Sequence, residues 1–239
     1  RLQQCYNIAD TLIVGQCIGS NALAAVGSAY TLMVFLISIL LGLSMGSGTV
    51  FSLQYGAGDL PALRRSIYVS FLLIGTVTVL LNVAVFLWLD PILRWLQVPY
   101  DVYPLMRNYL WIIFWGIAFT FLYNFYAALL RAVGDSVTPL WFLAVSVVLN
   151  IGLDLFLILV LDQGIEGAAV ATVIAQGMAA SGILLYTYKT RPELRLHRKD
   201  MRFDRSSLKE ITSFSTLTCV QQSVMNFGIL MVQGLVNSF

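Results

Sequence analysis

The chain has 239 residues, of which 59% are hydrophobic and 11% are charged, and its formal net charge is +2. Soluble globular domains carry roughly 25% charged residues, so this composition excludes an ordinary soluble protein and favours a lipid environment. The charged residues are also unevenly placed, and long stretches have none at all. These charge-free stretches are 11–58, 66–89, 108–130, 136–153, 167–188 and 211–239.

Such stretches match the length of membrane helices, because a bilayer core is crossed by about 20 apolar residues in helical conformation. They are too long, and too rich in Leu, Ile, Ala and Gly, for the alternating strands of a membrane barrel. Gly19-Ser20-Asn21 interrupts the first stretch with turn residues, which divides it into two helices. The sequence therefore predicts an all-α, polytopic membrane helix bundle with seven helices. Their predicted ranges are 2–18, 24–55, 66–89, 104–130, 137–161, 165–188 and 208–236.

The basic residues predict the orientation of these helices. If the N-terminus is cytoplasmic, twelve Lys and Arg residues fall in cytoplasmic segments, and only Arg94 and Arg107 fall in outside loops. Cytoplasmic loops of membrane proteins carry an excess of basic residues, so we expect the N-terminus to lie inside the cell. The twelve are Arg1, Arg64, Arg65, Arg131, Lys189, Arg191, Arg195, Arg198, Lys199, Arg202, Arg205 and Lys209.

One long polar segment, 189–207, separates the first six helices from the seventh. We expect a six-helix N-terminal lobe over 1–188, a solvated cytoplasmic linker over 189–207, and the first helix of a second lobe over 208–239. The basic linker adjoins no folded soluble domain, so nucleic-acid binding is not expected. The chain opens on Arg1 and reaches its first helix almost at once, which suggests that it is a piece of a longer protein.

Two carboxylates fall at membrane depth, Asp10 in the first predicted helix and Asp154 in the fifth. A charged side chain at the centre of a bilayer costs roughly 2.5–3.5 kcal/mol on insertion scales, and such residues usually mark an ion or substrate path. The alternative is a carboxylate near a helix end that reaches the lipid headgroups. Asp154 lies close enough to Asp162 for that interpretation to stay open.

Polar neighbours strengthen the functional interpretation. Asn7 and Asn150 precede the two acids by three and four residues, which places each pair on one helical face. Thr172 and Tyr109 add hydroxyls if their helices converge on the same place. Carboxylates with amide and hydroxyl oxygens suit a proton or a small hard cation such as sodium, so the sequence predicts a site for a coupling ion.

The sequence around these residues resembles the multidrug and toxic compound extrusion (MATE) family. The similarity runs through most of the chain, in the order YNIADTLIVG, ALAAVG, QYGAGD, LLRAVGDSVTP, VLNIGLDLFLI and GIEGAAVATVIAQ. It implies a V-shaped, two-lobed antiporter whose N-terminal half is present in this chain. It also implies a proton or sodium site, with Asn7 as a possible supporting residue. The site residues implied are Asp10, Tyr109, Asn150, Asp154 and Thr172, with sodium held by Asp10, Asn150, Asp154 and Thr172.

The function implied is the export of amphiphilic, often cationic compounds across the cell membrane in exchange for protons or sodium ions. Its partners would be the bilayer, the exported compound and a second lobe, and no cofactor beyond the coupling ion is expected. One alternative is a flippase for lipid-linked oligosaccharides with a related fold, although the charges at membrane depth are acidic rather than basic. Another is a seven-helix receptor, which would require an extracellular N-terminus.

An enzyme is not expected. Gly42-Leu43-Ser44-Met45-Gly46 has the spacing of a nucleophile elbow, but it falls inside a predicted membrane helix. His197, the only histidine in the chain, falls in the cytoplasmic linker. We therefore assign no catalytic residue and interpret Gly42 and Gly46 as positions of close helix packing.

Overall fold

The computed structural model describes residues 12–95, 98–197, 200 and 203–237, and every regular element in them is a helix. This confirms the predicted fold class. Residues 12–17 are helical and belong to the first predicted helix. The elements that follow are α2 (Ser20–Gly56), α3 (Leu60–Trp95), α4 (Tyr103–Trp115), α5 (Ile117–Ala132), α6 (Val137–Leu155), the π-helical turn η1 (Phe156–Val160), α7 (Gly164–Thr190), the 3-10 turn η2 (Pro192–Leu194) and α8 (Arg205–Asn237).

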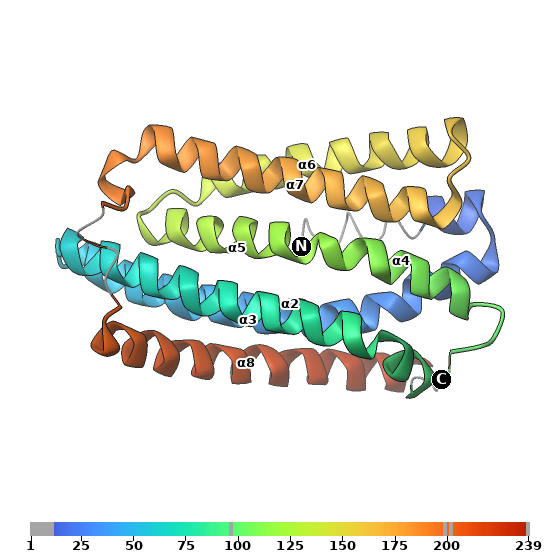
Figure 1. The fold of residues 1–239 in the computed structure, drawn as a ribbon, viewed down its shortest axis with the longest axis horizontal. Helices are drawn as coiled ribbons and strands as arrows, with labels where there is room; N and C mark the ends of the chain where they lie inside the picture. Colours follow the sequence, from blue (N-terminus) through green and yellow to red (C-terminus); the bar gives the residue numbers. More distant parts are fainter. Residues whose placement is uncertain (1–11, 96–97, 198–199, 201–202, 238–239) are drawn as a thin grey trace.

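The helices form an elongated up-and-down bundle (Figure 1). The consecutive helices α4 and α5 run through its middle. On one side α2 and α3 pack together with α8, although α8 comes last in the chain. On the other side α6 and α7 form a pair, and α7 contacts both α4 and α5. Residues of α7 can therefore meet residues of α4, α5 and α6 in the interior.

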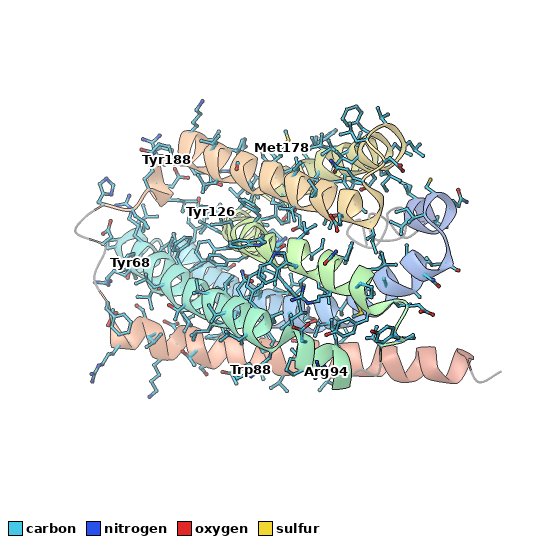
Figure 2. All side chains as sticks on the ribbon, turned by 45° about the vertical axis from the view of Figure 1, so that its right-hand side comes forward. Tyr68, Trp88, Arg94, Tyr126, Met178 and Tyr188 are labelled. Carbon is cyan, nitrogen blue, oxygen red and sulfur yellow. The ribbon has the colours of Figure 1, made fainter. Side chains whose placement is uncertain are left out.

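Apolar side chains cover much of the bundle's outer surface. Val79, Leu80 and Leu87 of α3 and Val145 and Val148 of α6 are large, apolar and exposed. Figure 2 shows Tyr68 near one end of α3 and Arg94 at its other end, so the exposed apolar residues of α3 lie between these two positions. An exposed apolar surface of this extent suits a lipid environment rather than water.

Four helices are long and apolar enough to cross a membrane: α2, α3, α6 continued by η1, and α7. The bent pair α4–α5 provides a fifth if the two helices form one span. α8 carries more polar residues than these helices. Its apolar residues are interrupted by Gln221, Gln222, Asn226, Gln233 and Asn237. The predicted seventh helix is therefore present, but it is more polar than the others.

A single helix was expected over 104–130, and the structure instead has two, which meet at Gly116 with a bend of 44°. The N–H of Gly116 donates to the carbonyl oxygen of Ile113, three residues back, at 2.8 Å. A bond to the third rather than the fourth preceding residue tightens the last turn and ends the regular α-helix. The axis changes direction before α5 begins at Ile117.

Glycines with positive φ form the predicted turn at 19–21 and the turn between α5 and α6. Gly19, which precedes α2, has φ +114°, and Gly134, between α5 and α6, has φ +90°. Both values are positive, and glycine adopts positive φ without strain because it has no Cβ. The boundaries at 18–20 and 133–136 therefore follow directly from local sequence.

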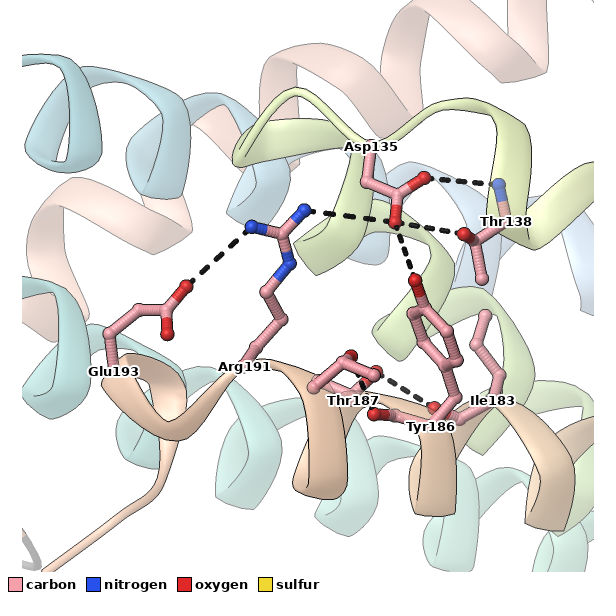
Figure 3. Close-up of polar contacts among 8 residues, drawn as sticks. Asp135, Thr138, Ile183, Tyr186, Thr187, Arg191 and Glu193 are labelled. Carbon is pink, nitrogen blue, oxygen red and sulfur yellow. Dashed lines mark hydrogen bonds and ion pairs between the residues drawn. The ribbon is translucent and has the colours of Figure 1, made fainter.

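We call the end of the bundle that carries Arg64, Arg131, Lys189 and Arg191 the basic end. At this end the carboxylate of Asp135 accepts hydrogen bonds from the backbone N–H of Thr138 at 3.1 Å and from its hydroxyl at 2.8 Å (Figure 3). Arg191 lies 3.8 Å from the same carboxylate. These contacts join the start of α6 to the end of α7.

The first part of the predicted linker is packed onto the basic end rather than solvated along its whole length. The Arg64 side chain donates from Nε to the carbonyl oxygen of Glu193 at 2.9 Å. Leu194, in the 3-10 turn η2, is buried in the main hydrophobic core. An apolar side chain held in the core explains why this part of the polar segment is ordered against the bundle.

The contact between α2 and α8 is unusually close. A side chain added at Gly42 would place its Cβ 2.6 Å from Cys219 Sγ and 2.8 Å from Cys219 Cα, and one added at Gly46 would collide with the backbone of Ser215. Ser215 also donates from its hydroxyl to the carbonyl oxygen of Leu43 at 3.2 Å. The two glycines therefore act as helix-packing positions, as expected, and their partner is α8.

Candidate functional site

One face of α6 carries three polar side chains in successive turns. Ser146, Asn150 and Asp154 are four residues apart, so they point in the same direction. All three are buried, and Asn150 and Asp154 have no exposed surface at all. Asp154 is the only charged side chain among the buried residues that the structure describes. A carboxylate near a helix end that reaches lipid headgroups would be exposed, so this interpretation does not fit Asp154.

Asn150 faces α7, where it meets Thr172. The amide Nδ2 of Asn150 donates to the hydroxyl oxygen of Thr172 at 3.4 Å, near the upper limit for a hydrogen bond. Within the described residues the other amide atom, Oδ1 of Asn150, accepts no hydrogen bond. A buried acceptor of this kind is costly unless something donates to it or binds it. Asn150 therefore presents an oxygen that can act as a ligand.

Tyr109 lies on α4, which packs against α7, and its side chain is 4% exposed. It belongs to the same core cluster as Ile165, Ala168 and Ala169 of α7. Four of the predicted site residues are thus buried on three helices, of which α7 packs against both α4 and α6, and Asn150 and Thr172 touch. Asp10 and its predicted neighbour Asn7 lie outside the described residues.

The helix that carries Asp154 changes its geometry just beyond that residue. α6 ends at Leu155, and the π-helical turn η1 follows over Phe156–Val160. Single π turns inside α-helices occur frequently at functional sites, because they shift the register of the helical faces. Gly167 of α7 makes room for this turn, since a Cβ there would lie 3.2 Å from Leu157 Cβ.

Several polar residues near these positions were not predicted. Gln176 follows Thr172 by one turn on α7, and its Oε1 accepts a hydrogen bond from the hydroxyl of Thr120 on α5 at 3.0 Å. Asn124, one turn further along α5, donates to the carbonyl oxygen of Thr120 at 2.8 Å. Ser146 donates to the carbonyl oxygen of Ala175 at 3.0 Å. The sequence signal that could have identified Gln176 and Ser146 was their four-residue spacing from Thr172 and from Asn150.

The arrangement has the chemistry of a cation site with mostly neutral oxygens. A carboxylate, an amide oxygen and hydroxyls can hold a proton or a hard cation such as sodium. The described residues contain no group of three or more His, Cys, Asp or Glu side chains that could hold a metal ion. Ser44 is buried inside α2, not at the sharp strand-to-helix turn of a nucleophile elbow.

Comparison with known proteins identifies the family. Residues 1–156 match the MatE family. The chain belongs to the MATE family of membrane transporters. On this membership the protein is a multi-pass membrane protein of a non-enzymatic family, as the sequence predicted, and the seven-helix receptor is excluded.

MATE relatives also align with the whole chain. It is 33% identical over 238 residues to the probable multidrug resistance protein YpnP of Bacillus subtilis (strain 168), covering 100% of this chain and 53% of the relative. The fold matches solved MATE structures in the straight and the bent conformation at 23% identity, each with a TM-score of 0.89. These matches cover 99% and 96% of this chain and 53% and 51% of those chains. The chain thus spans about half the length of the relatives that it matches.

Proposed function

We propose that this chain is the N-terminal half of a MATE antiporter that exports amphiphilic or cationic compounds in exchange for protons or sodium ions. The observation that carries the proposal is the fully buried carboxylate of Asp154 on the polar face of α6. A carboxylate at that depth is costly unless it is hydrogen-bonded, protonated or bound to a cation, and such residues commonly mark ion paths in membrane proteins. The name of YpnP, a probable multidrug resistance protein, supports an exported compound of this class.

In the proposed mechanism, Asp154 and Asp10 bind the coupling cation, and Asn150, Thr172 and Tyr109 provide neutral ligands or orient the acids. Binding neutralises charge in the interior of the lobe, which changes the free energy of one lobe conformation relative to another. The exported compound is displaced when the lobe changes shape. Residues 1–188 form this lobe, 189–207 the linker, and 208–239 the first helix of a second lobe.

The orientation belongs to the same proposal. The basic end faces the cytoplasm, since Lys and Arg concentrate there, and the N-terminus and 189–207 are proposed to lie on the same side of the membrane. A flippase for lipid-linked oligosaccharides is the second candidate, because related folds serve that function. It would need basic groups in its groove to meet phosphates, whereas the one buried charge in the described part of the lobe is acidic.

The test is drug export by membrane vesicles that contain the complete two-lobed transporter, driven by an imposed proton or sodium gradient. Asp154→Asn and Asp10→Asn are each expected to abolish gradient-driven export, and the double variant to be no worse, because members of one network are not additive. Asp162→Asn is the matched control. Asp162 is exposed and has φ +50°, a conformation that asparagine also adopts readily.

Near-normal gradient-driven export by both single variants, at matched protein levels in the membrane, would overturn the proposed site. Export that stays gradient-driven in Asp162→Asn but disappears in the other two variants would support it.

A further inference from the structure

The face of α7 that carries Thr172 makes polar contacts at two successive levels. Thr172 contacts Asn150 of α6 at 3.4 Å. One turn closer to the basic end, Gln176 accepts the hydroxyl hydrogen bond of Thr120 from α5 at 3.0 Å. Four residues separate Thr172 and Gln176, so both lie on one face of the helix. The same surface of α7 is therefore joined to α6 at one level and to α5 at the next.

Gln176 contacts α5 one turn after the bend of the α4–α5 pair. Thr120 is one turn after Gly116, and its hydroxyl also lies 3.2 Å from the Gly116 carbonyl oxygen. A Cβ at Gly116 would lie 3.0 Å from Gln176 Oε1 and 3.1 Å from Val173 Cγ2. The bend is thus pressed directly against α7, at the position where Gln176 makes its hydrogen bond.

The two arms of the bent pair have different roles. The α4 arm carries Tyr109, one of the residues proposed to serve the cation site, and the α5 arm carries Thr120. The bend of 44° separates them. α4 itself packs against α7, so the position of Tyr109 on this arm is coupled through the bend to how the α5 arm is held against α7. Hydrogen bonds between membrane helices are suited to this purpose, because an unpaired amide in an apolar interior is unfavourable.

We infer that Gln176 is a positioning residue of the cation site. Its hydrogen bond with Thr120 holds the α5 arm against α7, and this contact fixes the angle at Gly116 and with it the position of the α4 arm, which carries Tyr109, against α7. The inference rests on the proposed function of that site. In this proposal Gln176 is not itself a ligand of the cation, so its loss changes the geometry of the site and leaves the proposed ligands in place.

The experiment measures export by vesicles of the complete transporter while sodium chloride is titrated at fixed pH, and while pH is titrated without sodium. Gln176→Met and Thr120→Val nearly preserve side-chain volume but remove the hydrogen bond. Each should raise the cation concentration needed for half-maximal export by about 3- to 10-fold, the usual size for a membrane hydrogen bond. The maximal rate should change little, and the double variant should match the single ones.

Two controls separate positioning from general packing. Thr120→Ser keeps the hydroxyl and should keep the half-maximal concentration of the original protein. Tyr123→Phe removes a bond of similar length from α5, the 2.8 Å contact of the Tyr123 hydroxyl with the Pro139 carbonyl oxygen, which does not involve α7. It should leave cation dependence unchanged.

An unchanged half-maximal concentration in Gln176→Met and Thr120→Val would overturn the inference, and so would an equal effect of Tyr123→Phe. If a variant transports too slowly to measure, the sodium- or pH-induced rise in thermal stability of the purified protein takes the place of export. If the cation raises the thermal stability of the variant as much as that of the original protein, the inference is overturned. A smaller rise in the variant supports it. Asp154→Asn serves as the reference. If Asp154→Asn exports normally, the proposed cation site itself is wrong. If Asp154→Asn is inactive but Gln176→Met has an unchanged half-maximal cation concentration, only the role of Gln176 is wrong.

Discussion

At the scale of single residues, Asn150 is the part of the candidate site whose surroundings are described most completely. It has no exposed surface, it donates to Thr172 over a long 3.4 Å contact, and its Oδ1 accepts no hydrogen bond from the described residues. A buried amide that served only stability would make shorter hydrogen bonds with both its nitrogen and its oxygen. The geometry is better suited to an oxygen that meets a cation.

Asn150→Ala should therefore weaken cation binding with a modest effect on folding. Loss of one neutral ligand is expected to raise the half-maximal sodium or proton concentration of export about 10-fold, on the order of one hydrogen bond to a charged group. Titration of export in vesicles measures this value. Ser146→Ala is the control, because Ser146 lies one turn away on the same face and already donates to Ala175. A similar weakening in both variants would mean that the site is not centred on Asn150.

Asp135 at the basic end should contribute to stability in a pH-dependent way. Burial raises the pKa of its carboxyl, but the hydrogen bonds from Thr138 and the charge of Arg191 outweigh burial and hold the pKa below its ordinary value of 3.8. A carboxyl whose folded-state pKa is lowered stabilises the protein above its unfolded-state pKa, and this contribution is lost as pH falls through the folded-state pKa. The contribution is therefore complete at neutral pH and declines below about pH 4.

Asp135→Ala should lower the free energy of unfolding by about 1–2 kcal/mol at neutral pH, the usual value of a lost capping side chain. The difference from the original protein should shrink as pH falls below about 4. Thermal unfolding of the detergent-solubilised protein at several pH values measures both effects. Asp101→Ala, at an exposed position between α3 and α4, should have little effect. A pH-independent difference for Asp135→Ala would contradict the electrostatic explanation.

At the scale of helices, the pair α2–α8 depends on the absence of side chains at Gly42 and Gly46. Two helices approach closely when small residues line their contact, and packing then replaces the hydrophobic effect as the source of stability in lipid. Here the opposing residues Ser215 and Cys219 are also small. The contact lies between residues that are about 170 positions apart in sequence.

Gly46→Ala should separate the two helices, because the added methyl group meets the Ser215 backbone, which cannot move as a flexible side chain can. We expect a loss of about 1–3 kcal/mol, typical of overpacking. Gly27→Ala on the same helix is the matched control, since nothing lies within 4 Å of its Cβ position. That variant should be neutral or stabilising by up to about 1 kcal/mol, because alanine favours helix. Thermal unfolding of the two variants distinguishes these results, and equal destabilisation would argue against the close contact.

The sequence predicted the elements more fully than their contacts. Charge-free stretches and the turn at Gly19 placed the described helices to within a few residues, except at α3, which extends further at both ends. Pro91 lies in that extension beyond the predicted end at 89, and the helix continues past it with a kink at Trp88. The bend at Gly116 was missed, since a glycine inside an apolar stretch has no distinctive local signal.

The candidate site was predictable as a set of residue types, and its arrangement was not. Asn150 and Asp154 share a face by their spacing, which the sequence alone determines. The meeting of Asn150 with Thr172 depends on how α6 packs against α7, and periodicity does not determine this register. Gln176 was missed for a similar reason, because its partner Thr120 is 56 positions away along the chain.

At the scale of the whole molecule, charge divides the bundle into two ends. The basic end holds Arg64, Arg131, Lys189 and Arg191, whereas Asp90, Asp101, Asp162 and Glu166 belong to the opposite end. Figure 2 shows Tyr188 near the basic end of α7 and Arg94 at the far end of α3. This distribution is the basis of the proposed orientation.

The orientation predicts which single cysteines react with a membrane-impermeant thiol reagent in intact cells. After replacement of Cys5, Cys17 and Cys219, Tyr100→Cys should react from outside, since Tyr100 is 93% exposed. His197→Cys, also at an exposed position, should react only after the membrane is permeabilised. The reverse pattern would place the basic end outside the cell.

The buried Leu194 also determines how far the two proposed lobes can separate. Residues up to Leu196 pack at the basic end and α8 begins at Arg205, so the eight residues 197–204 join these two parts of the chain. A chain of that length reaches at most about 3.3–3.6 Å per residue, or on the order of 27 Å when fully extended. The short linker therefore limits how far the proposed lobes can separate at this end of the bundle, while it still allows them to tilt against each other.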